Sequence, residues 1–220
     1  MSKLIGVLIV DDHAIVREGL RAVIGLEEDM QVIGEASDGN EAIALSRHLK
    51  PDVILMDLLM PNMGGIEAIR EILEENPNHH ILVLTSFAEV DKILPTIRSG
   101  ALGYIVKNSS PGELLRAIRD VAKGAVYMQP DIARQLFHGL SQNSEAPVQP
   151  IEQLSIREIE ILKLVAQGLT NEEIGEQLSI SSRTVGVHVT HILEKLNLNN
   201  RTQAALFALR NGLVSLFPEE

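Results

Sequence analysis

An aspartate stands where a buried strand should end, at Asp57 in the stretch PDVILMDLLMPNMGG. The run from Val53 to Met56 is short and wholly apolar, which is typical of a strand buried on both faces. Pro61, Asn62 and two glycines then predict a loop. In open parallel sheets, ligands and chemistry collect at the carboxyl ends of the strands, so Asp57 is a candidate reactive carboxylate. Taken alone, it is equally a solvated residue that caps the loop.

Other apolar runs also end in polar side chains, namely Asp11 and Asp12, Thr85, and Lys107. One such residue is ordinary, but the carboxyl ends of parallel strands meet at one edge of a sheet. The four positions together with Asp57 therefore predict a single site. Its composition, with several acids, one lysine and one hydroxyl, favours chemistry on an anion that needs a cation beside it.

The elements that would position this site alternate between strand and helix. Apolar strand patterns recur five times in about the first 123 residues, at 4–10, 31–34, 53–56, 81–84 and 103–106. Each is followed by a helical pattern, the fourth at 90–98 with Pro95 inside it and the fifth starting at a Ser110-Pro111-Gly112-Glu113 cap. This alternation predicts an α/β domain with a doubly wound, five-stranded parallel sheet and right-handed crossovers.

Residues 1–123 resemble a response-regulator receiver domain of flavodoxin-like fold. The resemblance rests on VLIVDDH, ILMDLLMP, ILVLTS and GYIVKN, which stand in the expected order and spacing. It implies that Asp57 is the phosphoacceptor, that Asp11 and Asp12 belong to a Mg²⁺ site, and that Thr85 and Lys107 are the switch hydroxyl and the phosphoryl partner. Tyr104 matches the family's rotameric aromatic residue, although as a residue type it is as readily part of the core.

The chemistry of phosphoryl transfer agrees with that set. A carboxylate that attacks a phosphoryl group approaches a dianion, so a hard divalent cation with oxygen ligands is needed. Asp11, Asp12, Asp57 and the backbone carbonyl of Leu59 are the expected ligands. Lys107 would hold a phosphoryl oxygen as a point charge, and a threonine hydroxyl could move when the new oxygens appear.

Three histidines nearby are assigned structural roles. His13 is expected to cap or orient the first helix rather than to bind metal. His79 and His80 are expected in a solvated turn after Pro77.

The chain changes character after the receiver-like part. Residues 130–140 favour a short helix, and SQNSEAPVQPIEQ at 141–153 reads as a flexible linker. We therefore divide the chain into a receiver at 1–123, a linker at 124–153 and a helical domain at 154–220. That domain opens two helices with capping boxes, at Ser155 and Thr170. A third helix to Leu196 and a fourth between Asn200 and Gly212 predict four helices with a helix-turn-helix.

Residues 154–213 resemble the DNA-binding domain of the LuxR/NarL/FixJ regulators over their whole length. On the third helix, the core face carries Val185, Val189, Ile192, Leu193 and Leu196. The resemblance places DNA contacts on the opposite side, at Arg183, Thr184, Gly186, Val187, His188 and Thr190, with base readout at Gly186, Val187 and Thr190. The family often has lysine at the positions of Gly186 and Thr190, and this chain does not. For His188, packing and phosphate contact are equally open.

Charge predicts weak DNA binding by one copy. The chain carries a formal charge of −11, which argues against a protein that coats nucleic acid non-specifically. Residues 151–220 hold six basic and nine acidic side chains, a net of −3. Because phosphate neutralisation supplies much of the affinity for DNA, dimerisation should matter more than usual. The fourth helix, with a small-residue stripe around Ala204, Ala205 and Ala208, is a candidate for joining two copies, with core packing as the alternative.

Composition sets the remaining bounds. The chain lacks cysteine, which excludes disulfides and thiolate metal sites. No window is apolar for the ~18 residues that a membrane helix needs, and no secretory pattern opens the chain, so we expect a cytoplasmic protein without a membrane partner.

Together these patterns predict a phosphorylation-controlled transcription factor rather than an enzyme. Its expected partners are a sensor histidine kinase, double-stranded operator DNA, RNA polymerase and, on phosphorylation, a second copy of itself. One alternative is a DNA-binding regulator independent of phosphorylation, which the full acidic set and Lys107 disfavour. The other is a Mg²⁺-dependent aspartyl-phosphate hydrolase of the haloacid dehalogenase type, which typically has an aspartate where this chain has Leu59.

Overall fold

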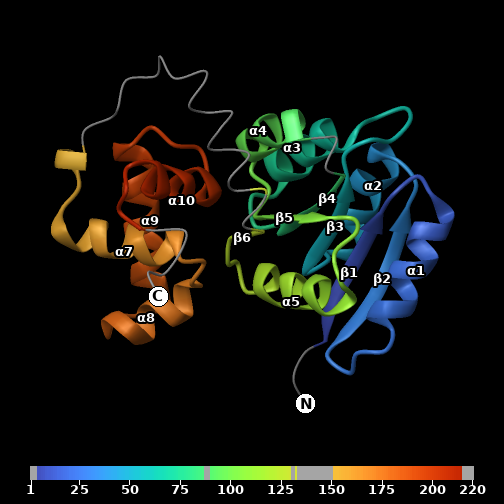
Figure 1. Cartoon of the computed structure of the whole chain (residues 1–220), viewed down its shortest axis with the longest axis horizontal. Coiled ribbons are helices and arrows are strands. Elements are labelled where there is room, and N and C mark those ends of the chain that lie inside the picture. The colour runs from blue at the N-terminus through green and yellow to red at the C-terminus, as the bar shows by residue number, and fades with distance from the viewer. Residues whose placement is uncertain (1–3, 87–89, 130–131, 133–150, 215–220) are drawn as a thin grey trace.

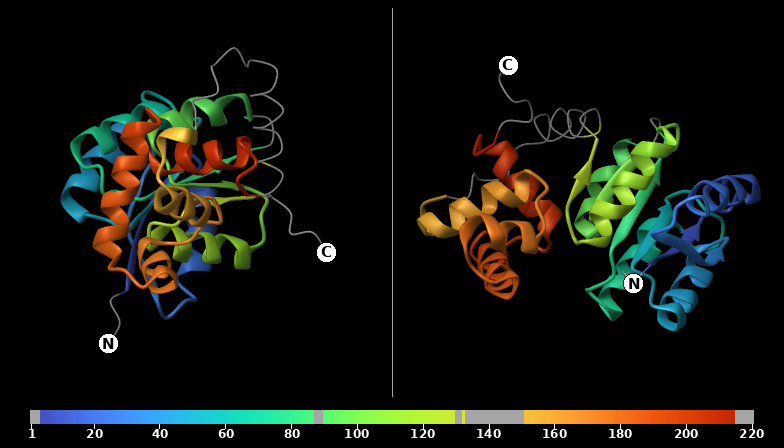
Figure 2. Two further views of the ribbon diagram at one scale, coloured as in Figure 1. Left: turned by 90° about the vertical axis from the view of Figure 1, so that its left-hand side faces the viewer. Right: turned by 90° about the horizontal axis from the view of Figure 1, so that it is seen from below.

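The computed structural model describes residues 4–86, 90–129, 132 and 151–214. The first part is a parallel sheet of order β2-β1-β3-β4-β5-β6 with helices on both faces (Figures 1 and 2). Its strands are β1 Ile5–Val10, β2 Met30–Ala36, β3 Val53–Asp57, β4 Ile81–Thr85, β5 Gly103–Val106 and β6 Tyr127–Met128. Its helices are α1 Ala14–Ile24, α2 Gly39–Leu49, α3 Gly65–Glu75, α4 Val90–Ser99 and α5 Pro111–Ala122. The doubly wound fold predicted from the sequence is confirmed.

The central strands are buried on both sides, as their continuous apolar runs predict. Two clusters of side chains fill the two layers: α2, α3 and α4 pack on one face of the sheet, and α1 and α5 on the other. Ile54 and Leu55 are neighbours on β3, yet each belongs to a different cluster, because successive side chains point to opposite faces. This double burial fixes the strand ends and the polar residues they carry.

A sixth strand, β6, was not predicted. Tyr127 and Met128 pair in parallel with Gly103 and Tyr104 of β5, so the sheet reaches into the segment that the sequence assigned to the linker. Two residues are too few for a periodic pattern, which explains why the sequence did not reveal the strand. The short helix expected at 130–140 lies outside the described residues, apart from Ile132, which is buried in a receiver core cluster.

The second part is helical. It begins with a 3₁₀ turn, η2 Ile151–Gln153, and contains α7 Ile156–Ala166, α8 Asn171–Leu178, α9 Ser182–Lys195 and α10 Arg201–Arg210. Both predicted capping boxes are present, at Ser155 and at Thr170. The alanines of α10 pack inside this domain's own core, together with the apolar face of α9, which is the alternative that the sequence left open for the small-residue stripe. Within the described residues, no helix is long and apolar enough to cross a membrane.

The two parts touch along α10 and one edge of the receiver sheet (Figure 1). The Thr202 side chain is fully buried, and its hydroxyl donates to the carbonyl of Ala101 at 2.8 Å. Asn200 donates its amide to the carbonyl of Ile97 in α4 at 2.9 Å, and Leu206 joins the receiver cluster on the α2–α3–α4 face. The second part is therefore docked through the first turns of α10.

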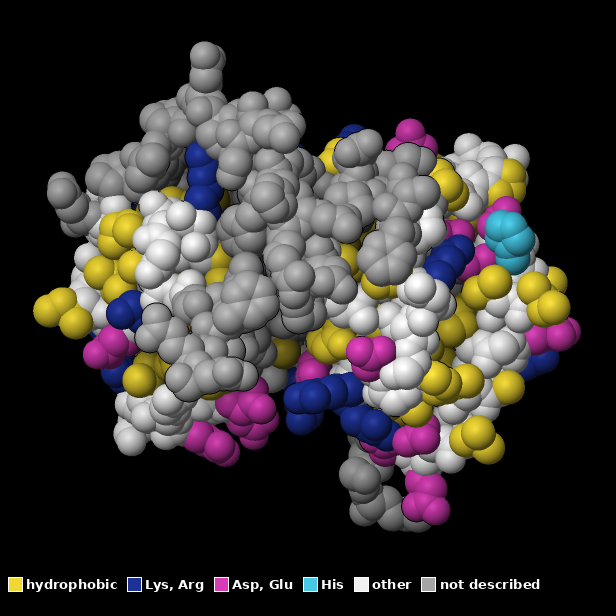
Figure 3. Space-filling model, viewed as in Figure 1, with side chains coloured by type: hydrophobic (Ala, Val, Ile, Leu, Met, Phe, Trp, Pro, Cys, Tyr) yellow, Lys and Arg dark blue, Asp and Glu magenta, His cyan; other side chains and the backbone are white. Residues whose placement is uncertain are grey.

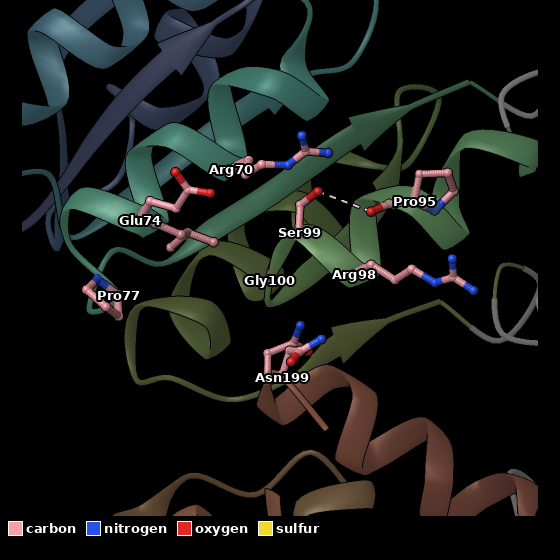
Figure 4. Close-up of a pocket in the computed structure, with 10 residues that line it drawn as sticks. Arg70, Glu74, Pro77, Pro95, Arg98, Ser99, Gly100 and Asn199 are labelled. Carbon is pink, nitrogen blue, oxygen red and sulfur yellow. Dashed lines mark hydrogen bonds between the residues drawn. The ribbon is translucent and has the colours of Figure 1, made fainter. Parts of the chain in front are cut away.

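Beside this contact lies a cleft of about 770 Å³ (Figure 4). Arg70 of α3, Arg98 of α4 and Asn199 of the loop before α10 line it. Ser99 donates its hydroxyl to the carbonyl of Pro95, inside the same helical turn. The docking contact thus leaves a solvent-filled gap between the two parts rather than a continuous interface.

Candidate functional site

The acids predicted from the strand ends come together at one edge of the sheet. β1 and β3 are neighbours with Val10 opposite Met56, so Asp11 and Asp57 follow side by side. Both carboxylates are buried, at 0% and 1% exposure. Ligand atoms of Asp11, Asp12, His13 and Asp57 all lie within 4.8 Å of one another. Two buried carboxylates beside a third, partly exposed one are costly without positive charge nearby, so the arrangement is consistent with a cation site.

Lys107 bridges the two buried acids from the end of β5. Its Nζ lies 2.8 Å from Oδ2 of Asp57 and 2.9 Å from Oδ2 of Asp11. Burial raises the pKa of Asp57 above its ordinary value, against the opposing effect of Lys107. Burial lowers the pKa of Lys107, but its bonds to Asp57 and Asp11 outweigh that effect, and the pKa is raised overall. The lysine stays charged, and its single positive charge is shared between the two carboxylates.

The loop after Asp57 fixes the other side of its carboxylate. Oδ1 of Asp57 accepts a hydrogen bond of 2.8 Å from the backbone N–H of Leu58. The loop then returns so tightly that a Cβ on Gly65 would lie 2.1 Å from the carbonyl oxygen of Asp57, so this position requires glycine. Leu59 begins the exposed part of the loop, with its side chain 48% exposed. The role of its carbonyl as a metal ligand remains a prediction.

The residues present fit a divalent cation. Oδ1 of Asp12 is buried and forms no hydrogen bond of good geometry, although Nδ1 of His13 lies 2.7 Å away. Together with Asp11 and Asp57 it forms an oxygen-rich donor set of the kind that Mg²⁺ prefers. The acidic site is thus consistent with metal binding.

Thr85 and Tyr104 occupy neighbouring strands. Thr85 ends β4, is 1% exposed, and donates its hydroxyl to the carbonyl of Ser86 at 3.2 Å. Tyr104 of β5 is fully buried among apolar side chains, and its hydroxyl has no partner in the described structure. Burial raises the pKa of Tyr104 well above its ordinary value, so the ring stays neutral. The switch roles of Thr85 and Tyr104 remain predictions.

Two expectations for the histidines were wrong. His79 is buried at 8% exposure, and desolvation lowers the pKa of both His79 and His80, so neither sits in a solvated turn. Their rings reach the backbone of Pro51 and Ala122, and that packing has no periodic signature in the sequence. His13 does stand at the N-cap of α1, as expected, but its side chain makes no capping hydrogen bond. Its ring lies against Asp12 instead.

The predicted DNA-reading residues lie on one side of α9. Arg183, Thr184, Val187 and Thr190 are exposed, while Gly186 and His188 are partly exposed. The opposite face, with Val185, Ile192 and Leu196, is buried in the core as predicted. A side chain on Gly186 would meet only the Asn171 amide, at 3.6 Å, so the centre of the α9 outer face is open. The receiver part covers α10 and leaves this face accessible.

Comparison with known proteins identifies the family. A model described as the response regulator receiver domain matches residues 7–119, and one described as bacterial regulatory proteins of the luxR family matches residues 152–208. The chain is 48% identical over 212 residues to the transcriptional regulatory protein LiaR of Bacillus subtilis, covering 96% of this chain and 100% of LiaR. This chain belongs to the response regulators of that two-domain type.

Other relatives of this response regulator agree. It is 38% identical over 210 residues to the response regulator protein VraR of Staphylococcus aureus, with 96% of this chain and 99% of VraR covered. The solved structure of the response regulator ChrA, from a heme-sensing two-component system, matches with a TM-score of 0.55 and 34% identity, covering 97% of this chain and 100% of ChrA. The RcsB–DNA complex matches with a TM-score of 0.57 and 26% identity over 94% of this chain and 99% of RcsB. The response regulator is a phosphorylation-controlled transcriptional regulator, and its relatives are regulators rather than enzymes.

Sequence reasoning missed two long-range contacts of this response regulator, one between its domains and one inside the DNA-binding domain. The docking of Thr202 on Ala101 joins residues 101 positions apart, and a threonine in a first helical turn gives no signal of such a contact. A structural ion pair between the buried Glu158 and the partly exposed Lys195 was also missed. Its capping half was visible in the sequence, but the lysine that completes it is 37 residues away.

Proposed function

We propose that Asp57 is the residue that accepts the phosphoryl group, from a sensor histidine kinase. The observation that carries this proposal is the contact of Lys107 with Asp57 and Asp11, which holds a buried nucleophilic carboxylate beside a fixed positive charge. An Asp57 oxygen would form the new P–O bond as the bond from phosphorus to the donor's histidine nitrogen breaks. The freed imidazole then takes up a proton.

Asp11, Asp12 and Asp57 would hold Mg²⁺, with the Leu59 carbonyl as a further ligand. The bound ion would supply positive charge to the equatorial oxygens of the phosphoryl group. Lys107 would release Asp57 and bind one phosphoryl oxygen, while remaining near Asp11. Thr85 would turn its hydroxyl from the Ser86 carbonyl toward the new oxygens, with Tyr104 packing behind it.

Phosphorylation would affect DNA binding through α10. In the docked form, Thr202, Asn200 and Leu206 are committed to the receiver, while the reading face of α9 is open. Phosphorylation would therefore control whether α10 is free to pair with a second copy, rather than whether α9 is accessible. Thr85 lies opposite Val106 at the carboxyl end of β5, whereas Ala101 precedes the start of that strand, so a change at Thr85 would have to be transmitted along β4 and β5 to reach the docking contact.

DNA would be read by Arg183, Thr184, Gly186, Val187, His188 and Thr190. Acidic and basic side chains are mixed on the face shown in Figure 3, and residues 151–220 carry a net charge of −3. Each copy would neutralise few phosphates, so a dimer on two half-sites would gain affinity through effective concentration. Contact with RNA polymerase and a cytoplasmic location follow from a role in transcription.

The experiment is to add Mg²⁺ and beryllofluoride, a phosphoryl mimic, to the full chain. We expect the molar mass measured by light scattering to rise from monomer toward dimer, and operator affinity to rise with it. The matched control is Asp57→Asn, which should show neither change. Equal DNA binding with and without the mimic would instead support the regulator that is independent of phosphorylation.

A further inference from the structure

We propose that Nδ1 of His13 is an additional ligand of the divalent ion. Compared with a site made of the carboxylates alone, this ligand would shift the ion preference from Mg²⁺ toward transition-metal ions. The inference rests on the metal site of the proposed function and assigns a residue that the sequence expectation excluded. It would let the response regulator load with Mn²⁺, Co²⁺ or Ni²⁺ when these ions are available.

The backbone of His13 places its ring at the site. Its backbone N–H donates to Oδ1 of Asp11 at 2.9 Å, which ties the residue to a buried acid. Its carbonyl accepts from Val16 and Arg17, so the backbone starts α1 without help from the side chain. The ring is therefore available for another role.

The ring is turned toward the acids although solvent is open to it. Nδ1 lies 2.7 Å from Oδ1 of Asp12 and 3.3 Å from Oδ1 of Asp11, while the side chain is 64% exposed. An exposed imidazole that only needed hydration could point away from the protein. Its position indicates an interaction at the mouth of the acidic site.

The distances suit a shared ion. Two ligands of one transition-metal ion, each bound at about 2.1 Å, can lie at most about 4.2 Å apart. The ligand atoms of Asp11, Asp12, His13 and Asp57 already lie within 4.8 Å of one another, so small side-chain rotations would suffice. Lys107 binds Oδ2 of both Asp11 and Asp57, whereas Oδ1 of Asp12 lies against the ring of His13.

Ligand chemistry then predicts the selectivity. Mg²⁺ prefers oxygen ligands and loses water reluctantly, so a nitrogen ligand adds little to its binding. Imidazole suits Ni²⁺ and other ions toward the tight-binding end of the divalent series. A mixed set of carboxylates and one imidazole should consequently raise Ni²⁺ affinity more than Mg²⁺ affinity.

The test compares ion affinities of the full, unphosphorylated chain by titration calorimetry. His13→Ala should lower Ni²⁺ affinity by about tenfold or more and change Mg²⁺ affinity by less than about twofold. His48→Ala, at an exposed position near the end of α2, is the matched control and should change neither. Equal loss for both ions, equal gain for both ions, or no change would each overturn the proposal.

A spectroscopic readout separates ligation from a structural effect. Mn²⁺ bound to the wild type should show ¹⁴N modulation in pulsed electron paramagnetic resonance, and His13→Ala should lack it. A nitrogen signal that persists in this variant, or is absent from the wild type, contradicts ligation by His13.

Asp12→Ala separates a failure of the whole metal site from a failure of the His13 ligand alone. If that variant binds Mg²⁺ and Ni²⁺ as the wild type does, the metal site of the proposed function is wrong. If it loses both ions while His13→Ala loses neither, only the role of His13 is wrong.

Discussion

Each domain contains a lysine that forms an ion pair with a buried carboxylate, and the pKa values of Asp57 and Glu158 are shifted in opposite directions. In the receiver, Lys107 lies 2.8 Å from Asp57 and 2.9 Å from Asp11. In the DNA-binding domain, Lys195 lies 2.7 and 2.9 Å from the two carboxylate oxygens of Glu158. The carboxylates are similarly buried, with side chains 1%, 0% and 5% exposed. The distances and the exposed fractions of the carboxylates do not distinguish the two pairs.

The pKa shifts do distinguish them. Burial would raise the pKa of Glu158, but Lys195 and the Ser155 cap outweigh it and lower the pKa to about 2. Asp57 lies deeper in the protein than Glu158, so desolvation, aided by the nearby charge of Asp11, outweighs Lys107 and its pKa is raised. A carboxylate with its full set of donors is a structural element, whereas one that is short of positive charge is ready to accept a cation and react.

The largest effect should come from Asp57→Asn. An amide is a poor nucleophile, so labelling by a small phosphodonor with Mg²⁺ should disappear, as measured by an intact-mass gain and its loss with hydroxylamine. Asp52→Asn is the control, because it retains an oxygen that can accept from Gly6 and should label normally. Undiminished labelling of Asp57→Asn would show that Asp57 is not the residue that accepts the phosphoryl group.

Lys107→Ala should separate the chemistry from the switch. The lysine is not the nucleophile, so part of the labelling should survive, but phosphorylation should no longer change oligomeric state or DNA affinity. Light scattering and DNA titration of the labelled variant measure this. Dimerisation equal to that of the parent would show that Lys107 is as passive as Lys195.

Glu158→Gln should affect stability alone. Its pKa of about 2, against an ordinary 4.5, corresponds to about 3 kcal/mol of unfolding free energy. Because the folded pKa is depressed, this contribution is present above pH 4.5 and is lost as the pH falls toward 2. Urea unfolding followed by circular dichroism should show the loss at pH 7, with labelling of Asp57 unchanged.

The control for that stability change is Glu160→Gln. Its side chain is 49% exposed and pairs with Arg157, so it should change stability by less than about 1 kcal/mol. Equal effects of the two variants would mean that the burial of Glu158 has no energetic consequence.

The smallest effect should come from adding a lysine to the outer face of α9. Gly186→Lys places a charge on the open face of α9, where it can reach phosphates. Affinity for operator and random DNA should both rise, the salt dependence should steepen by about one unit in the logarithmic slope, and binding should rely less on phosphorylation. A salt titration decides this, and an unchanged slope would mean that Gly186 does not face the duplex.

The convergence of the polar strand-end residues was predictable from the sequence because it follows from topology. Asp11, Asp57 and Lys107 each end a strand, and a parallel sheet brings strand ends together whatever the details of packing. Contacts that depend on how helices dock were not predictable: Lys195 reaching Glu158 and Thr202 reaching Ala101 have no periodic signature. The orientation of the His13 ring was not predictable either, since a helix N-cap position does not determine where the side chain points.

The most direct test of the contrast between the two pairs is a ¹³C carboxyl titration by nuclear magnetic resonance. The account predicts that Asp57 titrates above its ordinary 3.8, while Glu158 is still ionised well below its ordinary 4.5. Mg²⁺ should lower the pKa of Asp57 and leave Glu158 unchanged. If both carboxylates titrated below their ordinary values in the absence of metal, Asp57 would be as fully compensated as Glu158, and the account of a site short of positive charge would be contradicted.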